Sequence, residues 1–265
     1  GTDGKGTKIF NIPNQHITDY PFDNNYLDSG TSKVHSVLKD NAGNLWIAIY
    51  QKGVMMIPAQ PNSFKYIGYK SINKNIIGSN CITSLCRDHE GILWIGTDND
   101  GIYGITTELK QKVHYAPHDS PSSVPSTVFG LYEDSEHYLC FGSYTNGLGR
   151  LDMKTGQCSY LQNLTDKNGN RIQRVYDLVE DQDKRLWIAT MGAGLFYYDL
   201  KTGQSVYDPK FNAATKKYKW ISCLLYAGDN HLYVGTYDGI RCIELSTEDF
   251  KTEEILSRHI IHSLY

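Results

Sequence analysis

Histidine, cysteine and carboxylate side chains are the residues of this 265-residue chain that could perform chemistry. Two histidine pairs, His114/His118 and His259/His262, have close spacing, but a metal site needs three or four ligands. No further ligand can be assigned to either pair from the sequence. The chain also has no C-x-x-C, H-E-x-x-H, G-x-S-x-G or P-loop motif. We therefore expect no catalytic residues, no cofactor and no metal site.

The six cysteines are Cys81, Cys86, Cys140, Cys158, Cys223 and Cys242. An even number of cysteines in an exported protein is compatible with disulfides. However, most of these positions fall within apolar runs that resemble strands, where a free thiol commonly behaves as a small buried apolar group. We expect buried free thiols, with disulfides as the alternative.

Four of the aspartates, Asp40, Asp88, Asp134 and Asp181, occupy one position of an internal repeat. The repeat is visible in the stretches that begin at Val34, Ile82, Val128, Val175 and Ile221. Its aromatic position falls at Trp46, Trp94, Cys140, Trp187 and Tyr233, with spacings of 48, 46, 47 and 46 residues. Because catalysis needs a singular constellation, a residue that recurs in every repeat more commonly holds a turn.

Each repeat contains four short runs with strand character. In the first full repeat these are Val34 to Leu38, Asn44 to Ile49, Gly53 to Ile57 and Phe64 to Tyr69. Four strands every ~46 residues are the signature of a β-propeller blade, which must stack on its neighbours to bury both faces. The fold class predicted is therefore all-β, a β-propeller built from four-stranded blades.

Both ends of the chain carry fragments of the repeat, because residues 1–6 overlay residues 96–101 and residues 261–265 overlay the start at Val34. We expect one propeller segment over residues 1–265. It comprises a partial blade 1–33, blades 34–81, 82–127, 128–174, 175–220 and 221–257, and a partial blade 258–265. Five full repeats with two partial ones fit about six blades, or an arc of a seven-bladed ring.

The composition excludes some partners. The formal net charge of −3, without a basic stripe, argues against nucleic acid. No apolar run reaches the ~20 residues of a membrane span, so we expect no membrane contact by this segment.

The repeat resembles the two-component regulator propeller family, as in "SNCITSLCRDHEGILWIGTDNDGIYGI" (79–105) and "QRVYDLVEDQDKRLWIATMGAGLFYYD" (173–199). Repeat three departs from the pattern with Cys140 in place of Trp, and repeat five lacks the turn Asp. The resemblance implies the periplasmic sensor region of a Bacteroidetes hybrid two-component system. It also implies a neighbouring propeller and an immunoglobulin-like module, with a histidine kinase elsewhere in the protein.

Propeller ligands usually sit at the mouth of the central channel, which two sets of loops surround. These are the loops between the second and third strands and the segments that lead into each inner strand. Their residues vary between repeats, as expected of functional positions on a fixed scaffold. The candidate ligand-binding residues are Lys33, Tyr50, Asn80, Asp98, Asp100, Tyr144, Asn146, Arg174, Trp220 and Tyr237.

Aromatic faces beside polar groups are suited to carbohydrate. The function expected is a non-enzymatic periplasmic sensor that detects an oligosaccharide. One alternative is a protein-interaction or homodimerisation scaffold. A propeller lyase or glycosidase is the less favoured alternative, because no His/Glu acid–base pair stands out at the channel mouth.

Overall fold

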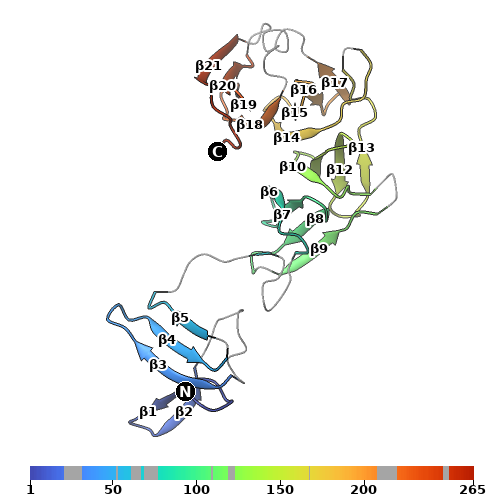
Figure 1. Ribbon diagram of the computed structural model, residues 1–265. Helices are drawn as coiled ribbons and strands as arrows, with labels where there is room; N and C mark the ends of the chain where they lie inside the picture. The colour runs from blue at the N-terminus through green and yellow to red at the C-terminus, as the bar shows by residue number, and fades with distance from the viewer. Residues whose placement is uncertain are drawn as a thin grey trace. The chain divides into compact units, whose positions relative to one another are not determined.

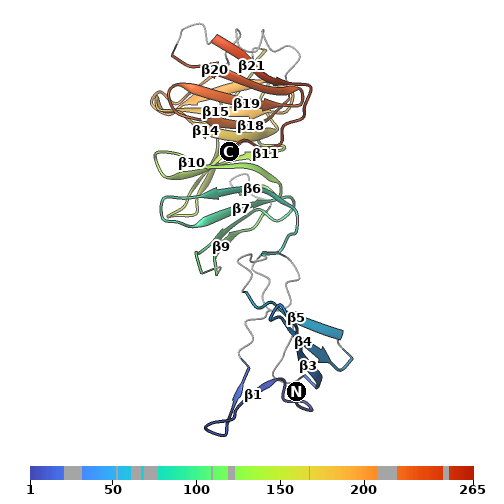
Figure 2. The same ribbon diagram turned by 90° about the vertical axis from the view of Figure 1, so that its left-hand side faces the viewer.

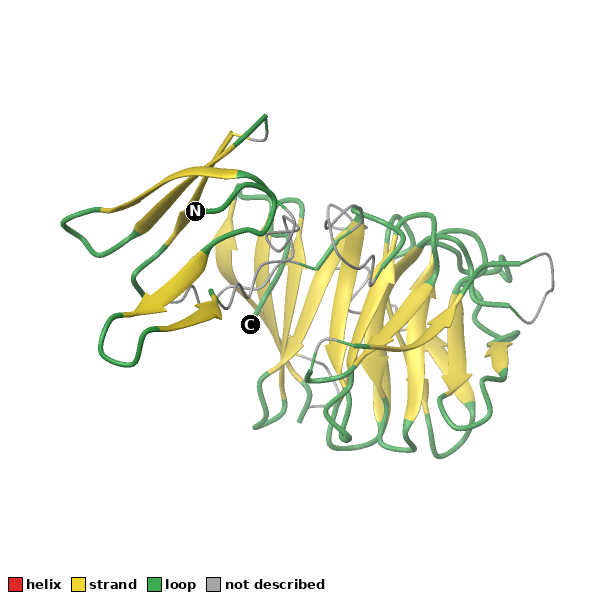
Figure 3. Ribbon diagram, turned by 90° about the horizontal axis from the view of Figure 1, so that it is seen from below, coloured by secondary structure: helices red, strands yellow, loops and turns green. Residues whose placement is uncertain are grey.

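The computed structural model describes residues 1–20, 32–51, 53–60, 67–68, 77–108, 110–118, 123–166, 168–207, 220–246 and 251–265. Every element of regular structure in these ranges is a β-strand or an isolated bridge (Figure 3). The chain forms two compact units, residues 1–78 and 79–265. Our expectation of one propeller segment over all 265 residues stays a prediction.

The first unit holds two antiparallel sheets (Figure 1). One pairs β1 (Lys8–Asn11) with β2 (His16–Asp19), and the other has the order β3 (Val34–Lys39), β4 (Leu45–Ile49) and β5 (Gly53–Ile57). The expected fourth strand of this repeat, Phe64 to Tyr69, falls largely outside the described residues.

The second unit holds four sheets, each with four antiparallel strands in sequence order. They are β6 (Ile82–Arg87) to β9 (Gln111–Tyr115), β10 (Val128–Glu133) to β13 (Cys158–Tyr160), β14 (Val175–Glu180) to β17 (Gln204–Tyr207), and β18 (Ile221–Tyr226) to β21 (Lys251–Ser257). The strands between them are β7 (Leu93–Thr97), β8 (Ile102–Ile105), β11 (Tyr138–Ser143), β12 (Leu148–Asp152), β15 (Arg185–Thr190), β16 (Leu195–Asp199), β19 (His231–Thr236) and β20 (Gly239–Glu244).

These four sheets follow one another as stacked layers in chain order, with β6, β10, β14 and β18 as successive inner strands (Figures 1 and 2). Each sheet falls within one predicted repeat. The all-β fold class and the four-stranded propeller blade are confirmed, and the second unit is an arc of such blades.

The core of this arc lies between the blades. Trp94 on β7 is 3% exposed and packs with Val128, Leu131 and Phe141 of the next blade. Trp187 is 2% exposed and belongs to a cluster that includes Ile221 and Val234 of the blade after it. Trp94 and Trp187 are therefore blade-packing residues, as the repeat predicts.

The repeated aspartate fastens this tryptophan to the turn between the first two strands. The carboxylate of Asp88 accepts hydrogen bonds from the Ile92 N–H at Oδ1 (2.8 Å) and from Trp94 Nε1 at Oδ2 (2.8 Å). Asp40 and Trp46 make the same indole contact at 2.8 Å, and Asp181 and Trp187 make it at 2.7 Å. One carboxylate thus closes the turn and orients the packing residue.

Repeat three replaces the indole with a guanidinium. Cys140 stands at the tryptophan position and donates only a thiol contact of 3.3 Å to Asp134 Oδ2. The same oxygen accepts a hydrogen bond from Arg150 Nε at 2.9 Å. Arg150 lies directly opposite Cys140 in the β11–β12 register, where Gly104 faces Trp94 in the preceding blade. The donor to the buried aspartate therefore comes from the neighbouring strand.

Each end fragment is hydrogen-bonded to a neighbouring repeat. The N–H of Val34, which opens β3, donates to the Thr2 carbonyl at 2.9 Å, and that of Ile261 donates to the Thr236 carbonyl at 3.1 Å. A Cβ added to Gly235 would lie 2.9 Å from the Ile261 side chain, just as one at Gly142 would crowd the start of β14. Ile261 therefore occupies the position of a first residue of a further inner strand.

Candidate ligand-binding site

The inner strands of the arc each carry an irregularity at the same point. Antiparallel pairing with the second strand shifts register between Val128 and Leu131 in β10 and between Val175 and Asp177 in β14. Such bulges leave a residue unpaired and change the direction of its side chain. The residues at the shifts include Phe129 and Tyr176, whose rings stack with centroids 4.5 Å apart and planes at 19°.

Other aromatic groups continue from this pair. The Tyr144 ring lies 6.2 Å from Phe129, and the Arg174 guanidinium lies 5.0 Å from the Tyr144 centroid. The Trp220 and Tyr237 rings have centroids 5.5 Å apart and planes tilted by 40°. We call Phe129, Tyr144, Arg174, Tyr176, Trp220 and Tyr237 the aromatic strip.

The rings of the strip differ in burial. Burial raises the pKa of Tyr176, with a smaller contribution from Tyr237. The exposed fractions of Tyr144, Trp220 and Tyr237 are 45%, 46% and 42%. The strip therefore offers three half-exposed aromatic side chains beside one guanidinium, backed by two rings that are less exposed.

Backbone contacts hold the strip in place. The Arg174 N–H donates to the Tyr144 carbonyl (3.2 Å), and the Met191 N–H donates to the Arg174 carbonyl (3.0 Å). Met191 also forms a β-bridge with Trp220. These contacts hydrogen-bond the segment before an inner strand to the loop between the second and third strands of a neighbouring repeat. They fix the backbone of the loops that carry the strip.

The structure brings four of the ten predicted residues together in this strip: Tyr144, Arg174, Trp220 and Tyr237. Three others take part in local contacts. Asp98 Oδ1 accepts the Thr127 hydroxyl at 2.7 Å, and Asp100 accepts the Tyr103 hydroxyl. The N–H of Asn146 donates to Ser143 Oγ at 2.8 Å.

The remaining three predicted residues lie elsewhere. Asn80 is exposed in the lead-in segment of β6. Lys33 and Tyr50 belong to the first unit, where Lys33 Nζ lies 2.9 Å from Asp3 Oδ1 and Tyr50 stacks on His35 at 5.1 Å.

Sequence reasoning missed Phe129 and Tyr176, although a signal was present. The second residue of the inner run varies strongly between repeats, as His35, Thr83, Phe129, Tyr176 and Ser222, while the residue before it is always Val or Ile. Strong variation of the residue type at one position of an otherwise regular strand indicates a side chain that does not pack in the core.

One carboxyl group next to the strip has an unusual pKa. Burial raises the pKa of Asp177 to about 6. Its two oxygens accept backbone hydrogen bonds from Leu224 (2.7 Å) and Leu178 (2.9 Å). A perturbed carboxyl can indicate catalysis, but Oδ2 of this one ties β14 to Leu224 on β18 and Oδ1 accepts the N–H of the next residue on β14, which is a structural role.

All six cysteines are free thiols. Cys140, Cys223 and Cys242 are buried as expected, Cys86 and Cys158 are only partly buried, and Cys81 is exposed. Among the described residues, no helix is long and apolar enough to cross a membrane.

Comparisons with known proteins agree with this architecture. The sequence profile of the family described as "Two component regulator propeller" matches residues 76–99 and 165–192. No curated protein sequence matches the chain.

Among solved structures, the chain is similar to extracellular domains of two proteins from B. thetaiotaomicron. These are the hybrid two component systems BT3049 (17% identity, TM-score 0.52, 95% of this chain and 43% of that one) and BT4673 (18%, 0.53, 100% and 36%). A third is the β-propeller domain of Cps50 (Swd1) from Myceliophteria thermophila (17%, 0.50, 70% and 58%). These likenesses show the propeller fold. The chain spans less than half the length of the two bacterial proteins.

Proposed function

We propose that this chain is a non-enzymatic, periplasmic sensor segment of a hybrid two-component system, which detects an oligosaccharide and passes the signal to a histidine kinase elsewhere in the protein. The matches to the regulator propeller profile and the likeness to extracellular sensor domains support this role. The aromatic strip is the observation that carries the choice of ligand.

The strip suits a sugar because its exposed surface is both flat and polar. Tyr144, Trp220 and Tyr237 present ring faces on which the apolar face of a pyranose can stack. Arg174 supplies several N–H donors for hydroxyl groups, and its stacking on Tyr144 restricts its orientation. An extended chain of several sugar units fits a row of rings better than a single monosaccharide does.

Signalling would follow from a shift of populations. A ligand on the strip favours the arrangement of the sensor that binds it better, by no more than the difference in its affinity for the two states. The hydrogen bonds that join Tyr144, Arg174 and Met191 give the rim a continuous backbone along which several blades respond together.

Calorimetric titration with a panel of plant and host-glycan oligosaccharides tests the proposal. We expect one sugar class to bind, and both Trp220→Ala and Tyr144→Ala to weaken it at least tenfold, about 1.4 kcal/mol. Phe10→Ala is the matched control, since Phe10 is an exposed aromatic (56%) on β1, outside the strip. Failure of a folded chain to bind any sugar would count against the ligand, and release of shortened sugars would refute the non-enzymatic role.

A scaffold that contacts a neighbouring propeller, an immunoglobulin-like module or a second copy is the other candidate. It can be tested on the inner strand β6, where Leu85 occupies the repeat position of Leu131 and Leu178, which are 6% and 3% exposed. A scaffold predicts that Leu85→Ser changes the oligomeric state or domain contacts without changing sugar affinity. Sedimentation of wild type and variant distinguishes the two.

A further inference from the structure

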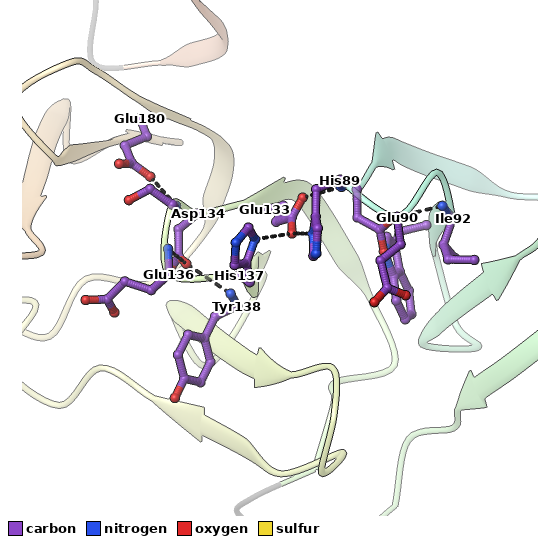
Figure 4. Close-up of polar contacts among 12 residues, drawn as sticks. His89, Glu90, Ile92, Glu133, Asp134, Glu136, His137, Tyr138 and Glu180 are labelled. Carbon is purple, nitrogen blue, oxygen red and sulfur yellow. Dashed lines mark hydrogen bonds and ion pairs between the residues drawn. The ribbon is translucent and has the colours of Figure 1, made fainter.

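A second group of chemically capable side chains lies at the far end of β10 from the aromatic strip. Phe129 is near the start of this strand and Glu133 is its last residue. The two imidazoles that meet Glu133 come from different turns, His89 from the β6–β7 turn and His137 from the β10–β11 turn (Figure 4). Among the described residues, these three are the group of His, Cys and carboxylate side chains with ligand atoms close enough to hold one metal ion.

The geometry gathers all three groups around one point. His137 Nδ1 lies 3.0 Å from Glu133 Oε1, and His89 Nδ1 contacts the same oxygen. The two imidazole centroids are 4.0 Å apart. The possible ligand atoms of all three residues lie within 4.8 Å of one another, which a small local movement reduces to the separation found around a single ion.

Glu133 is held in place from the protein side. Its side chain is 11% exposed, and its Oε2 accepts the His89 backbone N–H at 2.7 Å. Glu180 in the next blade makes the equivalent contact, with Oε2 accepting the Ser135 N–H at 2.7 Å. One carboxylate oxygen, Oε2, is therefore enough to link two blades. The other, Oε1, can contact other side chains or a ligand.

That second oxygen has different neighbours in the two blades. Glu180 Oε1 faces Lys184 Nζ at 3.4 Å, whereas Glu133 Oε1 faces His137, which occupies the same repeat position as Lys184. A lysine ammonium neutralises a carboxylate and cannot ligate while charged. An imidazole neutralises a carboxylate only when it is protonated, and in its neutral form it is a preferred ligand of Zn²⁺.

We infer that His89, Glu133 and His137 form a binding site for a divalent transition-metal ion, with Zn²⁺ as the ion of best fit. Two imidazoles and one carboxylate are a known donor set for this ion, and they leave a coordination position open. The imidazole side chains are 47% and 51% exposed, so water completes the coordination. The ion joins the turn of one blade to the inner strand and turn of the next.

The test is calorimetric titration of the untagged, reduced, metal-free chain with Zn²⁺. We expect one equivalent to bind. His137→Gly is the most informative variant, because His137 has φ 63° and the corresponding positions in two other repeats are Gly43 and Gly91. Glycine suits this backbone, so the variant keeps the fold and loses a ligand.

We expect His137→Gly and His89→Ala each to weaken Zn²⁺ binding at least tenfold. His259→Ala, at an exposed histidine outside the group, leaves binding unchanged. Zn²⁺ should also raise the melting temperature of wild type and of His259→Ala but not of the two ligand variants. Absence of saturable binding by the folded wild type, or binding of equal strength in both ligand variants, would overturn the inference and leave a histidine pair that only hydrogen-bonds to Glu133.

Discussion

Replacement of Arg150 by methionine tests how repeat three manages without its tryptophan. The Asp134 side chain is fully buried, and Arg150 is 16% exposed. Arg150→Met keeps much of the side-chain length but removes the guanidinium, so Asp134 Oδ2 retains only the weak Cys140 thiol. Its Oδ1 keeps the backbone N–H groups of Glu136 and Tyr138, both at 3.0 Å.

The expected cost follows from the burial of the remaining charge. Breaking a buried ion pair by removing one partner costs about 3–5 kcal/mol. The two backbone hydrogen bonds to Oδ1 persist, so we expect the lower end, about 3 kcal/mol of unfolding free energy. The control is Lys112→Met, because Lys112 and its partner Glu90 are 49% and 58% exposed and such surface pairs contribute about 0–1 kcal/mol.

Urea denaturation followed by fluorescence and by circular dichroism measures both variants. The double variant Cys140→Trp/Arg150→Gly provides the sharper test, because it installs the pair that Trp94 and Gly104 form in the preceding blade. We expect it to be more stable than Arg150→Met alone. The reasoning fails if Arg150→Met loses under about 1 kcal/mol, the same as the surface control.

Three further predictions concern the carboxyl, glycine and thiol groups. Since Asp177 has a pKa of about 6 in the fold against an ordinary 3.8, its contribution to stability falls by about 3 kcal/mol as the pH rises from 4 to above 6. Urea denaturation of wild type and of Asp177→Asn at pH 4 and at pH 7.5 measures this loss. Between the two pH values, the unfolding free energy of wild type should fall by about 3 kcal/mol more than that of Asp177→Asn. Gly142→Ala should lower the unfolding free energy by about 2–3 kcal/mol, because the added Cβ would lie 2.3 Å from the Val175 carbonyl oxygen; an unchanged urea midpoint would contradict this. Iodoacetamide should label exposed Cys81 first and Cys140 last, since burial raises the pKa of the Cys140 thiol, and mass spectrometry of timed samples gives the order.

The repeat made the blade predictable because it reports backbone structure. The repeated Asp marks the turn between the first two strands, and the repeated Gly marks the start of the third. These features depend on residues close in sequence, so a local pattern contains them. The candidate site depends on contacts between residues that are far apart in the sequence.

Two physical effects explain why the positions of Phe129 and Tyr176 and the contact of His89 with Glu133 were not predictable from the sequence. The bulge that redirects Phe129 and Tyr176 is a departure from strand alternation, which a period-two pattern does not reveal. The meeting of His89 with Glu133 joins residues 44 positions apart in adjacent blades. Which side chains touch between blades depends on how the sheets twist against each other, and a repeat period does not specify that.

The exchange of donors at Asp134 also means that positions 140 and 150 work as a pair. With neither an indole on β11 nor a guanidinium on β12, the buried Asp134 carboxylate would keep backbone donors at Oδ1 and lose its strong donor at Oδ2. Repeat five took another route, since Ala227 and Tyr233 replace both the acid and the indole. A redesign of any blade therefore has to treat acceptor and donor as one unit.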